Sequence, residues 1–159
     1  MNIKIVCVGK IKEKFYRDAI QEYGKRMGRY ANFQIVEVPD EKTPDNASEH
    51  EMDLIKEKEG ERILKHLRDQ DYVIGLFIQG KTLDSVELST HLQQLFLRGT
   101  SSVVFVIGGS LGLSNQVEKR CDFQLSFSKM TFPHQLMRVI LSEQIYRSFR
   151  IMNHEPYHK

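Results

Sequence analysis

Two segments in the last third of the chain carry the residue types that could do chemistry. The first, Ile107–Ser114, reads IGGSLGLS, and the second, Phe127–His134, reads FSKMTFPH. Glycines in the first segment would let a ligand approach the backbone closely, because they carry no side chain. Ser128, Thr131 and free backbone groups in the second could hydrogen-bond the edge of a purine. Apolar cover would come from Leu76, Leu111, Met130 and Phe132. These residue types predict a pocket for an adenosine-bearing cofactor, although ordinary turns would have the same spacing.

The first segment also fits the G-x-S-x-G pattern of a serine hydrolase. Gly108-Gly109-Ser110-Leu111-Gly112 is expected between a strand and a helix, as that turn requires. A hydrolase also needs an acid and a histidine after later strands. Asp122 precedes the only later strand, and no acid is placed to orient His134. The turn pattern fits a hydrolase but the acid partner is missing. A serine hydrolase that uses Ser110 is therefore only the alternative function.

An earlier segment, Gly75–Thr82, matches the phosphate-loop pattern G-x-x-x-x-G-K-T with the sequence GLFIQGKT. Phosphate loops need flexible residues between the glycines, so that backbone N–H groups can surround phosphates. Here the residues after the first glycine continue an apolar strand, and the next helix signal comes only at Asp84. We interpret the match as chance, and Gly80-Lys81-Thr82 as the turn that leaves the strand.

No set of residues predicts a metal site. Cys7 and Cys121 are the only cysteines, and each lies beside an apolar run, so we expect two buried free thiols. His154 and His158 have the spacing of a metal-binding pair, but nothing completes a ligand set. We expect a polar tail there and no bound metal.

Short apolar segments predict strands, and helical patterns lie between them. Strands are expected at Asn2–Val8, Phe33–Val38, Tyr72–Ile78, Val103–Ile107 and Phe123–Phe127. Helices are expected at Lys12–Tyr30, 48–68, 84–98, 114–120 and His134–Ile151, with caps at Ser48, Asp84 and Ser114. This alternation predicts an α/β fold, with a mostly parallel sheet and helices on both faces, in a single domain over residues 1–159. The carboxyl ends of its strands would bring Leu76–Gly80 beside the two loop segments.

The charge distribution does not identify a binding partner. Residues 1–36 carry eight lysines and arginines against three acids, whereas residues 37–71 carry six against twelve. The formal net charge is only +2, so a polyanion would be attracted to part of the surface at most. No apolar run approaches the ~20 residues that span a membrane, and the first residues lack the pattern of a cleavable signal. We expect a cytoplasmic protein with no membrane partner.

The last predicted helix is apolar on more than one face. Its apolar residues are Leu136, Met137, Val139, Ile140, Leu141, Ile145, Tyr146 and Phe149. A surface helix needs only one apolar stripe, and a small domain has few positions for a fully buried helix. We therefore expect a second copy of the chain to cover part of this helix, which gives a homodimer.

The two loop segments together resemble a known enzyme class. Ile107–Ser114 followed by LSFSKMTFPH, which ends at His134, is similar to the SPOUT methyltransferases. Within that class the chain resembles the bacterial family that methylates N3 of a pseudouridine in 23S ribosomal RNA. The likeness extends from the opening strand with Gly9-Lys10, through Tyr146-Arg147, to the ending Asn153–Lys159.

The resemblance implies properties that periodicity does not reveal. It implies a trefoil knot near the C-terminus, S-adenosylmethionine held in a bent form, and a homodimer with the last helix in its interface. The positions that match the cofactor site are Leu76, Gly108, Phe127, Ser128, Lys129, Met130, Thr131 and Phe132. The tail Tyr157-His158-Lys159 resembles the part that meets the target nucleotide, across the dimer.

The implied reaction leaves few tasks to side chains. N3 of the base must lose its proton before or during attack, so a general base or a stabilised anion helps. We expect the catalytic residues to be His158, Tyr157 and Arg147, with His158 as the base. Arg147 and Lys159 could instead stabilise the anion or bind phosphate. The expected substrate is 23S rRNA within the ribosome or its large subunit, and a noncatalytic RNA-binding module is a further alternative.

Overall fold

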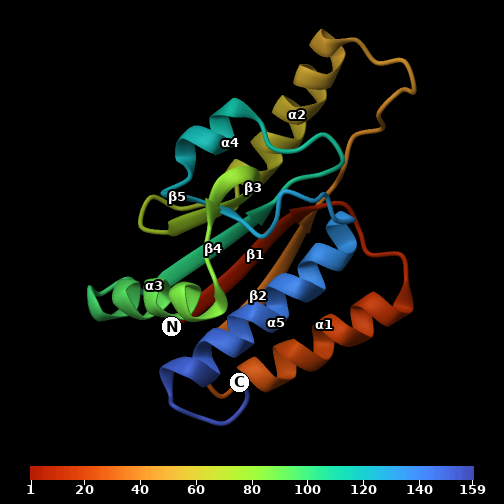
Figure 1. Cartoon of the computed structure of the whole chain (residues 1–159). Coiled ribbons are helices and arrows are strands. Elements are labelled where there is room, and N and C mark those ends of the chain that lie inside the picture. Colours follow the sequence, from red (N-terminus) through yellow and green to blue (C-terminus); the bar gives the residue numbers. More distant parts are fainter.

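The computed structural model describes residues 1–159 as strands that alternate with helices (Figure 1). In chain order the elements are β1 (Asn2–Val8), α1 (Lys14–Met27), β2 (Asn32–Val38), α2 (Glu49–Leu64), β3 (Tyr72–Thr82), α3 (Ser85–Leu97), β4 (Ser102–Ile107), α4 (Asn115–Arg120), β5 (Phe123–Ser126) and α5 (His134–Met152). Each strand and helix that the sequence predicts is present, in the predicted order.

The strands form one sheet in the order β2-β1-β4-β3-β5, and every neighbouring pair is parallel. The predicted mostly parallel sheet is confirmed, and no antiparallel strand joins it. All residues of β4, at the centre, are buried, as its continuous apolar run indicates. Because the strands run the same way, the loops that follow β3, β4 and β5 leave the same edge of the sheet.

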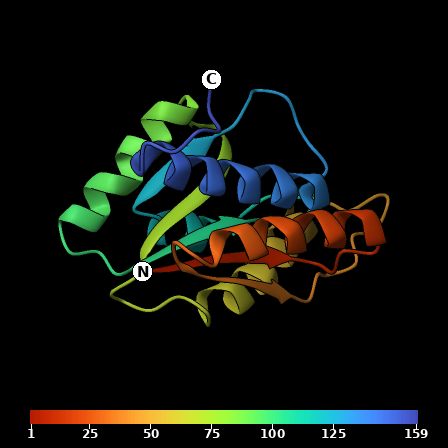
Figure 2. The ribbon, with the colours of Figure 1, turned by 90° about the horizontal axis from the view of Figure 1, so that it is seen from below.

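Helices cover both faces of the sheet, and each face has its own apolar cluster. α1, α3 and α5 pack on one face, where Ile3, Ile5 and Cys7 of β1 belong to the larger cluster. α2 and α4 pack on the other face, around Val6 and Val8. Figure 2 shows α5 and α2 on opposite sides of the strands. Ile3, Ile5 and Cys7 therefore share one face of β1, and the opposite face of this strand is covered as well.

Local capping signals place the helix starts correctly. Ser48 caps α2 in a capping box with Glu51, whose backbone N–H donates to Ser48 Oγ at 3.1 Å. Asp84 Oδ1 accepts from the Glu87 N–H at 2.7 Å at the start of α3. Ser114 caps α4 in the same way. The predicted end of the second helix is wrong, because α2 stops at Leu64 and turns follow it.

The end of the third strand also differs from the prediction. Gly80-Lys81-Thr82 is not a turn that leaves the strand, because β3 continues to Thr82. Both Leu76 and Lys81 are paired with Leu125 of β5, so residues 77–80 bulge out between them. Pairing with β5 resumes after the bulge. The sequence pattern of β3 alone cannot predict this pairing. The phosphate-loop interpretation stays excluded, since the matching residues are extended and helix α3 begins only at Ser85.

Helix α5 lies between α1 and α3 and packs on the sheet. Leu141, Ile145 and Phe149 are buried in the core, so one chain already covers much of the apolar surface that suggested a dimer. Leu136, Val139 and Ile140 are only half-buried. No helix, α5 included, combines the length and apolar character needed to cross a membrane.

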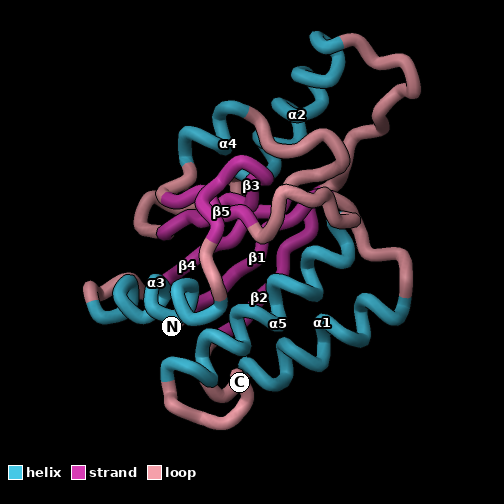
Figure 3. The backbone as a smooth tube through the Cα atoms, in the orientation of Figure 1, coloured by secondary structure: helices cyan, strands magenta, loops and turns pink.

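The loops after β4 and β5 run beside each other over the carboxyl edge of the sheet (Figure 3). Both loops line one pocket there, as the sequence predicts for Ile107–Ser114 and Phe127–His134. The trefoil knot that the resemblance implies at this end of the chain remains a prediction.

Candidate functional site

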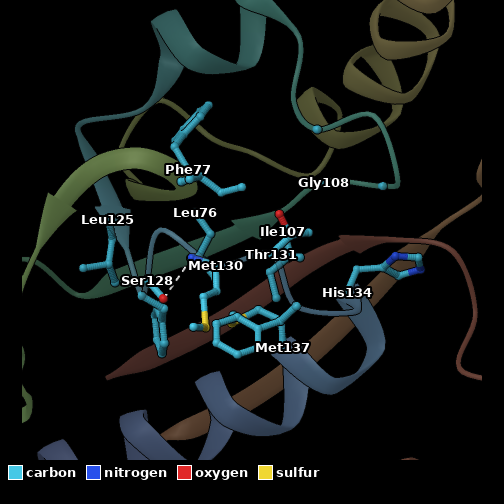
Figure 4. A pocket seen from close by; sticks show the side chains of 15 residues that line it. Leu76, Phe77, Ile107, Gly108, Leu125, Ser128, Met130, Thr131, His134 and Met137 are labelled. Atoms are coloured by element: carbon cyan, nitrogen blue, oxygen red, sulfur yellow. Dashed lines mark hydrogen bonds between the residues drawn. The ribbon is translucent and has the colours of Figure 1, made fainter.

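The pocket at the carboxyl edge is built from the ends of three neighbouring strands and the start of α5 (Figure 4). It is mostly apolar, with a few hydroxyl and backbone groups. Its lining residues are Leu76, Phe77, Ile78, Ile107, Gly108, Gly109, Gly112, Leu125, Phe127, Ser128, Met130, Thr131, Phe132, His134 and Met137. Such a cavity, with few polar groups that converge on it, is typical of a site for a small organic ligand.

Most of the cofactor residues predicted from the sequence meet in this pocket. Leu76, Gly108, Phe127, Ser128, Met130, Thr131 and Phe132 all line it. Lys129 does not, and its side chain is exposed. Phe77 and Ile78 also line it, and they belong to the segment Leu76–Gly80 that was expected beside the two loops, although only Leu76 was predicted to bind the cofactor. Met137, on the first turns of α5, was not predicted to line the pocket.

The glycine turn after β4 is tight because its backbone folds on itself. The Gly112 N–H donates to the Gly109 carbonyl at 3.1 Å, and Gly112 has a φ of +90°. A Cβ on Gly108 would lie 2.8 Å from the Gly112 carbonyl carbon, so no side chain fits there. The turn therefore presents bare backbone to the pocket, as its glycines predict.

This geometry does not assemble a hydrolase site. Ser110 is exposed at the tip of the glycine turn and does not line the pocket. Asp122 is engaged at the start of β5, where its carboxylate accepts from the Val73 N–H at 2.8 Å and pairs with Arg120. The structure thus gives Ser110 no acid partner, and the residues for acyl transfer do not come together.

The second loop is tied to the β3 bulge by Ser126, the last residue of β5. Ser126 Oγ donates to the Ile78 carbonyl at 2.8 Å and also lies 3.1 Å from the Ser128 carbonyl. Within the loop, the Met130 N–H donates to Ser128 Oγ at 3.0 Å. Met130 is left 73% exposed at the rim of the pocket. The two walls of the pocket therefore hold each other in place.

His134 closes one end of the pocket at the start of α5. Burial lowers the pKa of its imidazole, and the nearby Arg138 guanidinium lowers it further. The ring is therefore neutral at neutral pH and can offer one donor and one acceptor nitrogen. The sequence placed His134 at the end of the loop but gave it no cofactor role.

Two buried charged residues, which sequence reasoning missed, support the pocket from behind. Arg138 is fully buried and donates to Glu37 at 2.8 Å and to the carbonyls of Val8 and Gly9 at 2.7 and 2.8 Å. These bonds fix the start of α5 to the carboxyl end of β1. The only sequence signal is an arginine within an apolar stretch of the helix.

The second of these residues is Glu59 of α2, whose carboxylate lies directly behind the glycine turn. A Cβ on Gly109 would be 3.1 Å from Glu59 Oε1. Glu59 Oε2 accepts from the Glu41 N–H at 2.9 Å. Burial is the main reason that the pKa of Glu59 is raised, and the neighbouring Asp40 raises it further. Glu59 is thus a poorly solvated carboxylate whose size limits the position of the turn.

The predicted catalytic residues gather in a second cluster, around Glu143 on α5. Arg147 donates to Glu143 Oε1 through Nη2 at 2.7 Å and through Nε at 3.0 Å. Tyr157 donates its hydroxyl to the same oxygen at 2.9 Å, and Arg147 Nη1 lies 3.0 Å from His158 Nδ1. Burial raises the pKa of Tyr157 to about 12, and its bond to Glu143 adds to the shift, so the phenol stays protonated. Lys159 is exposed at the end of the chain.

The tail that carries Tyr157 and His158 is held against α5 and the turn that follows α1. Glu155 pairs with Arg150 at 2.7 Å and accepts from the Tyr30 hydroxyl at the same distance. Arg150 also donates to the Pro156 carbonyl. None of Arg147, Tyr157 and His158 lines the pocket of its own chain. The structure therefore brings the predicted catalytic residues together, but apart from the predicted cofactor residues.

No group of three or more metal-ligating side chains occurs in the structure. Cys7 and Cys121 are free, with Cys7 buried and Cys121 half-buried. Burial raises the pKa of both thiols, to about 12 and about 11, so neither is a reactive thiolate at neutral pH.

Known proteins match this chain over its whole length. The family model described as "Predicted SPOUT methyltransferase" matches residues 1–158. A protein of Clostridium botulinum (strain 657) named "Ribosomal RNA large subunit methyltransferase H" is 60% identical over 159 residues, which cover all of both chains. A protein of the same name from Bifidobacterium animalis subsp. lactis is 61% identical over the same full length.

Solved structures with the same fold are more distant in sequence. A probable methylase family protein from Haemophilus influenzae has a TM-score of 0.55 at 19% identity, over 99% of this chain and 70% of that one. A probable methyltransferase from Bordetella pertussis has a TM-score of 0.55 at 13% identity, over 92% of this chain and 95% of that one. At these identities the likeness concerns the fold alone.

Proposed function

The chain belongs to the SPOUT methyltransferase family, and we propose that it transfers a methyl group from S-adenosylmethionine to N3 of a pseudouridine in 23S rRNA. Its full-length relatives are named as methyltransferases of large-subunit ribosomal RNA, which supports this class of substrate. The observation that carries the proposal is the pocket at the carboxyl edge, where a glycine turn faces an apolar, hydroxyl-bearing loop.

The lining of the pocket suits S-adenosylmethionine. Bare backbone at Gly108 and hydroxyls at Ser128 and Thr131 can hydrogen-bond an adenosine, and the apolar lining covers its rings. No carboxylate, lysine or arginine lines the pocket, so nothing there would hold a triphosphate. The aromatic rings of Phe127 and Phe132 provide faces that attract a cation such as a sulfonium. When bound, S-adenosylmethionine supplies a methyl group on an electrophilic sulfonium, so the main task of the protein is alignment.

The cluster around Glu143 suits the other reactant, because the pseudouridine ring becomes negative when N3 loses its proton. A guanidinium can only donate hydrogen bonds, so its contact with His158 makes Nδ1 the acceptor. A neutral His158 then carries its proton on Nε2 and offers an N–H to the substrate. This geometry favours a donor that stabilises the anion over the general base expected from the sequence. Arg147, held by Glu143, adds positive charge beside it.

A second copy of the chain would explain why the two groups of residues lie apart. We propose a homodimer in which the tail of one chain serves the pocket of the other. The half-buried apolar residues Leu136, Val139 and Ile140 on α5 would lie in the interface. In this arrangement each active site takes its cofactor pocket from one chain and Arg147, Tyr157 and His158 from the partner. We place the single-domain protein in the cytoplasm, where ribosomes are assembled.

Calorimetric titration with S-adenosylmethionine tests the cofactor assignment directly. We expect saturable binding, and no binding at millimolar cofactor would refute the proposal. For the reaction, ribosomes, large subunits and free 23S rRNA that lack the modification should each be incubated with the protein and tritiated cofactor. We expect methylated pseudouridine in the digested RNA, identified by mass spectrometry.

Other outcomes would support the alternatives. Labelling of Ser110 by a fluorophosphonate, together with no cofactor binding, would support a serine hydrolase. RNA binding without cofactor binding would support a noncatalytic module.

A further inference from the structure

A second hollow adjoins the proposed cofactor pocket. It lies between the first turn of α1 and the first turn of α5, and its lining residues are Glu13, Phe15, Tyr16, Pro133, His134 and Gln135. His134 lines both cavities, so it forms the wall between them. Figure 1 shows α1 and α5 side by side, with the loop from β1 to α1 near the start of α5. A ligand in the hollow would therefore be a direct neighbour of a ligand in the pocket.

Phe15 presents an aromatic ring to solvent at this hollow. Its side chain is 63% exposed, and its ring is paired with that of the neighbouring Tyr16, with centroids 4.4 Å apart at a tilt of 54°. It takes no part in either apolar cluster, so packing of the fold does not require an aromatic residue there. An exposed ring of this kind is a surface on which a nucleic-acid base can stack.

The chain around Phe15 is basic. Residues 10–17 hold the cations Lys10, Lys12, Lys14 and Arg17 against the single acid Glu13. Lys14 is paired with Asp18, and Arg17 donates to the Ile11 carbonyl. Lys10 and Lys12 are exposed and take part in no ion pair. Two free lysines beside an exposed ring match the charge and the flat bases of RNA.

The same segment is held in place by contacts with distant parts of the chain. The Ile11 N–H donates to Glu37 at 3.1 Å, and the Lys12 N–H donates to the Gln135 side chain at 3.3 Å. Ile11 itself is buried. A surface whose backbone is already fixed loses little entropy when a ligand binds, so its side chains can contribute to affinity.

We propose that this hollow binds a nucleotide of the RNA substrate that flanks the methylated one. Its base stacks on Phe15, and phosphates on either side of it contact Lys10 and Lys12. This inference rests on the proposed RNA methylation, because it assigns the neighbour of the target nucleotide to the neighbour of the cofactor pocket. The positive charge favours RNA over a second copy of the chain, since a self-associating face needs acids to meet its lysines.

Replacement of the ring and of the lysines tests the two contacts separately. Phe15→Ala should weaken RNA binding about tenfold, as expected for the loss of one stacked base, whereas Phe15→Trp should retain it. In Lys10→Gln/Lys12→Gln, the slope of log affinity against log salt should be smaller by roughly 1.5, as expected for two lost phosphate contacts. Filter binding of 23S rRNA fragments or large subunits measures both effects, and calorimetry should show unchanged affinity for S-adenosylmethionine in all variants.

Two exposed residues far from the hollow provide matched controls. Leu97→Ala removes an apolar side chain that is 81% exposed at the end of α3, and Lys119→Gln removes an exposed charge on α4. Both should bind RNA like the wild type. Equal RNA affinity of Phe15→Ala and wild type would overturn the proposal, as would dissociation of a dimer by Phe15→Ala in sedimentation.

These outcomes separate the inference from the proposed function. If the wild type binds cofactor and methylates rRNA while Phe15→Ala and the lysine variant behave identically to it, only the inference fails. If the wild type binds no cofactor but loses RNA affinity when Phe15 is replaced, the proposed methylation fails and the RNA surface stands.

Discussion

Gly108 lies where the chain leaves β4, and an added methyl group there has no free space. We predict that Gly108→Ala lowers the affinity for S-adenosylmethionine about tenfold or more, because the new Cβ pushes the Gly112 backbone into the pocket. Calorimetric titration measures the effect, and thermal unfolding shows whether the fold persists. Gly24→Ala is the control, since a Cβ there would make only ordinary contact with Phe33 and Gly24 lies outside the pocket. Unchanged cofactor affinity in Gly108→Ala would place the cofactor elsewhere.

His158 offers a second test at a single residue. If Nε2–H stabilises the anion, His158→Gln keeps an N–H near the same position, whereas His158→Ala removes it. We predict that single-turnover methylation falls about a hundredfold in His158→Ala and recovers in part in His158→Gln. Rapid-quench assays with saturating cofactor measure the methylation step. Equal loss in both variants would instead favour His158 as the general base, which glutamine cannot replace.

The stability of the start of α4 should affect the pocket, because α4 directly follows the glycine turn that lines the pocket. Ser48 and Ser114 both cap helices through their hydroxyl groups, but only Ser114 is buried beside that turn. We predict that either serine-to-alanine variant loses about 1 kcal/mol of unfolding free energy. Only Ser114→Ala should also bind S-adenosylmethionine several-fold more weakly. Urea unfolding and calorimetry measure the two effects, and equal cofactor affinity in both variants would contradict a role of α4 in holding the turn.

The strands show how far sequence patterns reach at the level of elements. The short apolar runs predicted all five strands, and burial on both faces of β4 matches its unbroken apolar run from Val103 to Ile107. The continuation of β3 to Thr82 was not predicted, because it depends on pairing with Leu125 and Ser126 of β5. A strand that resumes after a bulge is stabilised by its neighbour rather than by its own pattern.

At the scale of the whole molecule, the proposed dimer makes a quantitative prediction. Gly108→Ala impairs the pocket, and a chain without residues 154–159 lacks the tail. If the tail acts across the dimer, mixing the two variants under conditions of subunit exchange should restore about a quarter of the wild-type activity, because half of the dimers are mixed and each has one intact site. Tritium incorporation into rRNA measures the recovery.

The same mixture distinguishes the alternatives for the tail. If each tail served the pocket of its own chain, every site would contain one defect and no activity would return. The truncated chain should still bind S-adenosylmethionine, since no residue of 154–159 lines the pocket of its own chain and the partner's tail is proposed to meet the target nucleotide. Loss of cofactor binding with intact RNA binding would reverse the assignment of the tail.

The sequence by itself determined the α/β alternation, the parallel sheet and the two loops that line the pocket. These features depend on local periodicity, on glycines, and on the rule that parallel strands end at one edge. The family resemblance also predicted Arg147, Tyr157 and His158 as catalytic residues. The three lie together in the structure, and their catalytic role stays a prediction.

Only the tertiary structure decided what surrounds those residues. Phe77 reaches the pocket through the β3 bulge, Glu59 lies behind the glycine turn, and Arg138 is buried against the end of β1. The hollow at Phe15 forms where α1 meets α5. Each of these contacts joins residues that are far apart in the sequence. Such contacts depend on how whole elements pack, and packing has no period along the chain that a sequence pattern could reveal.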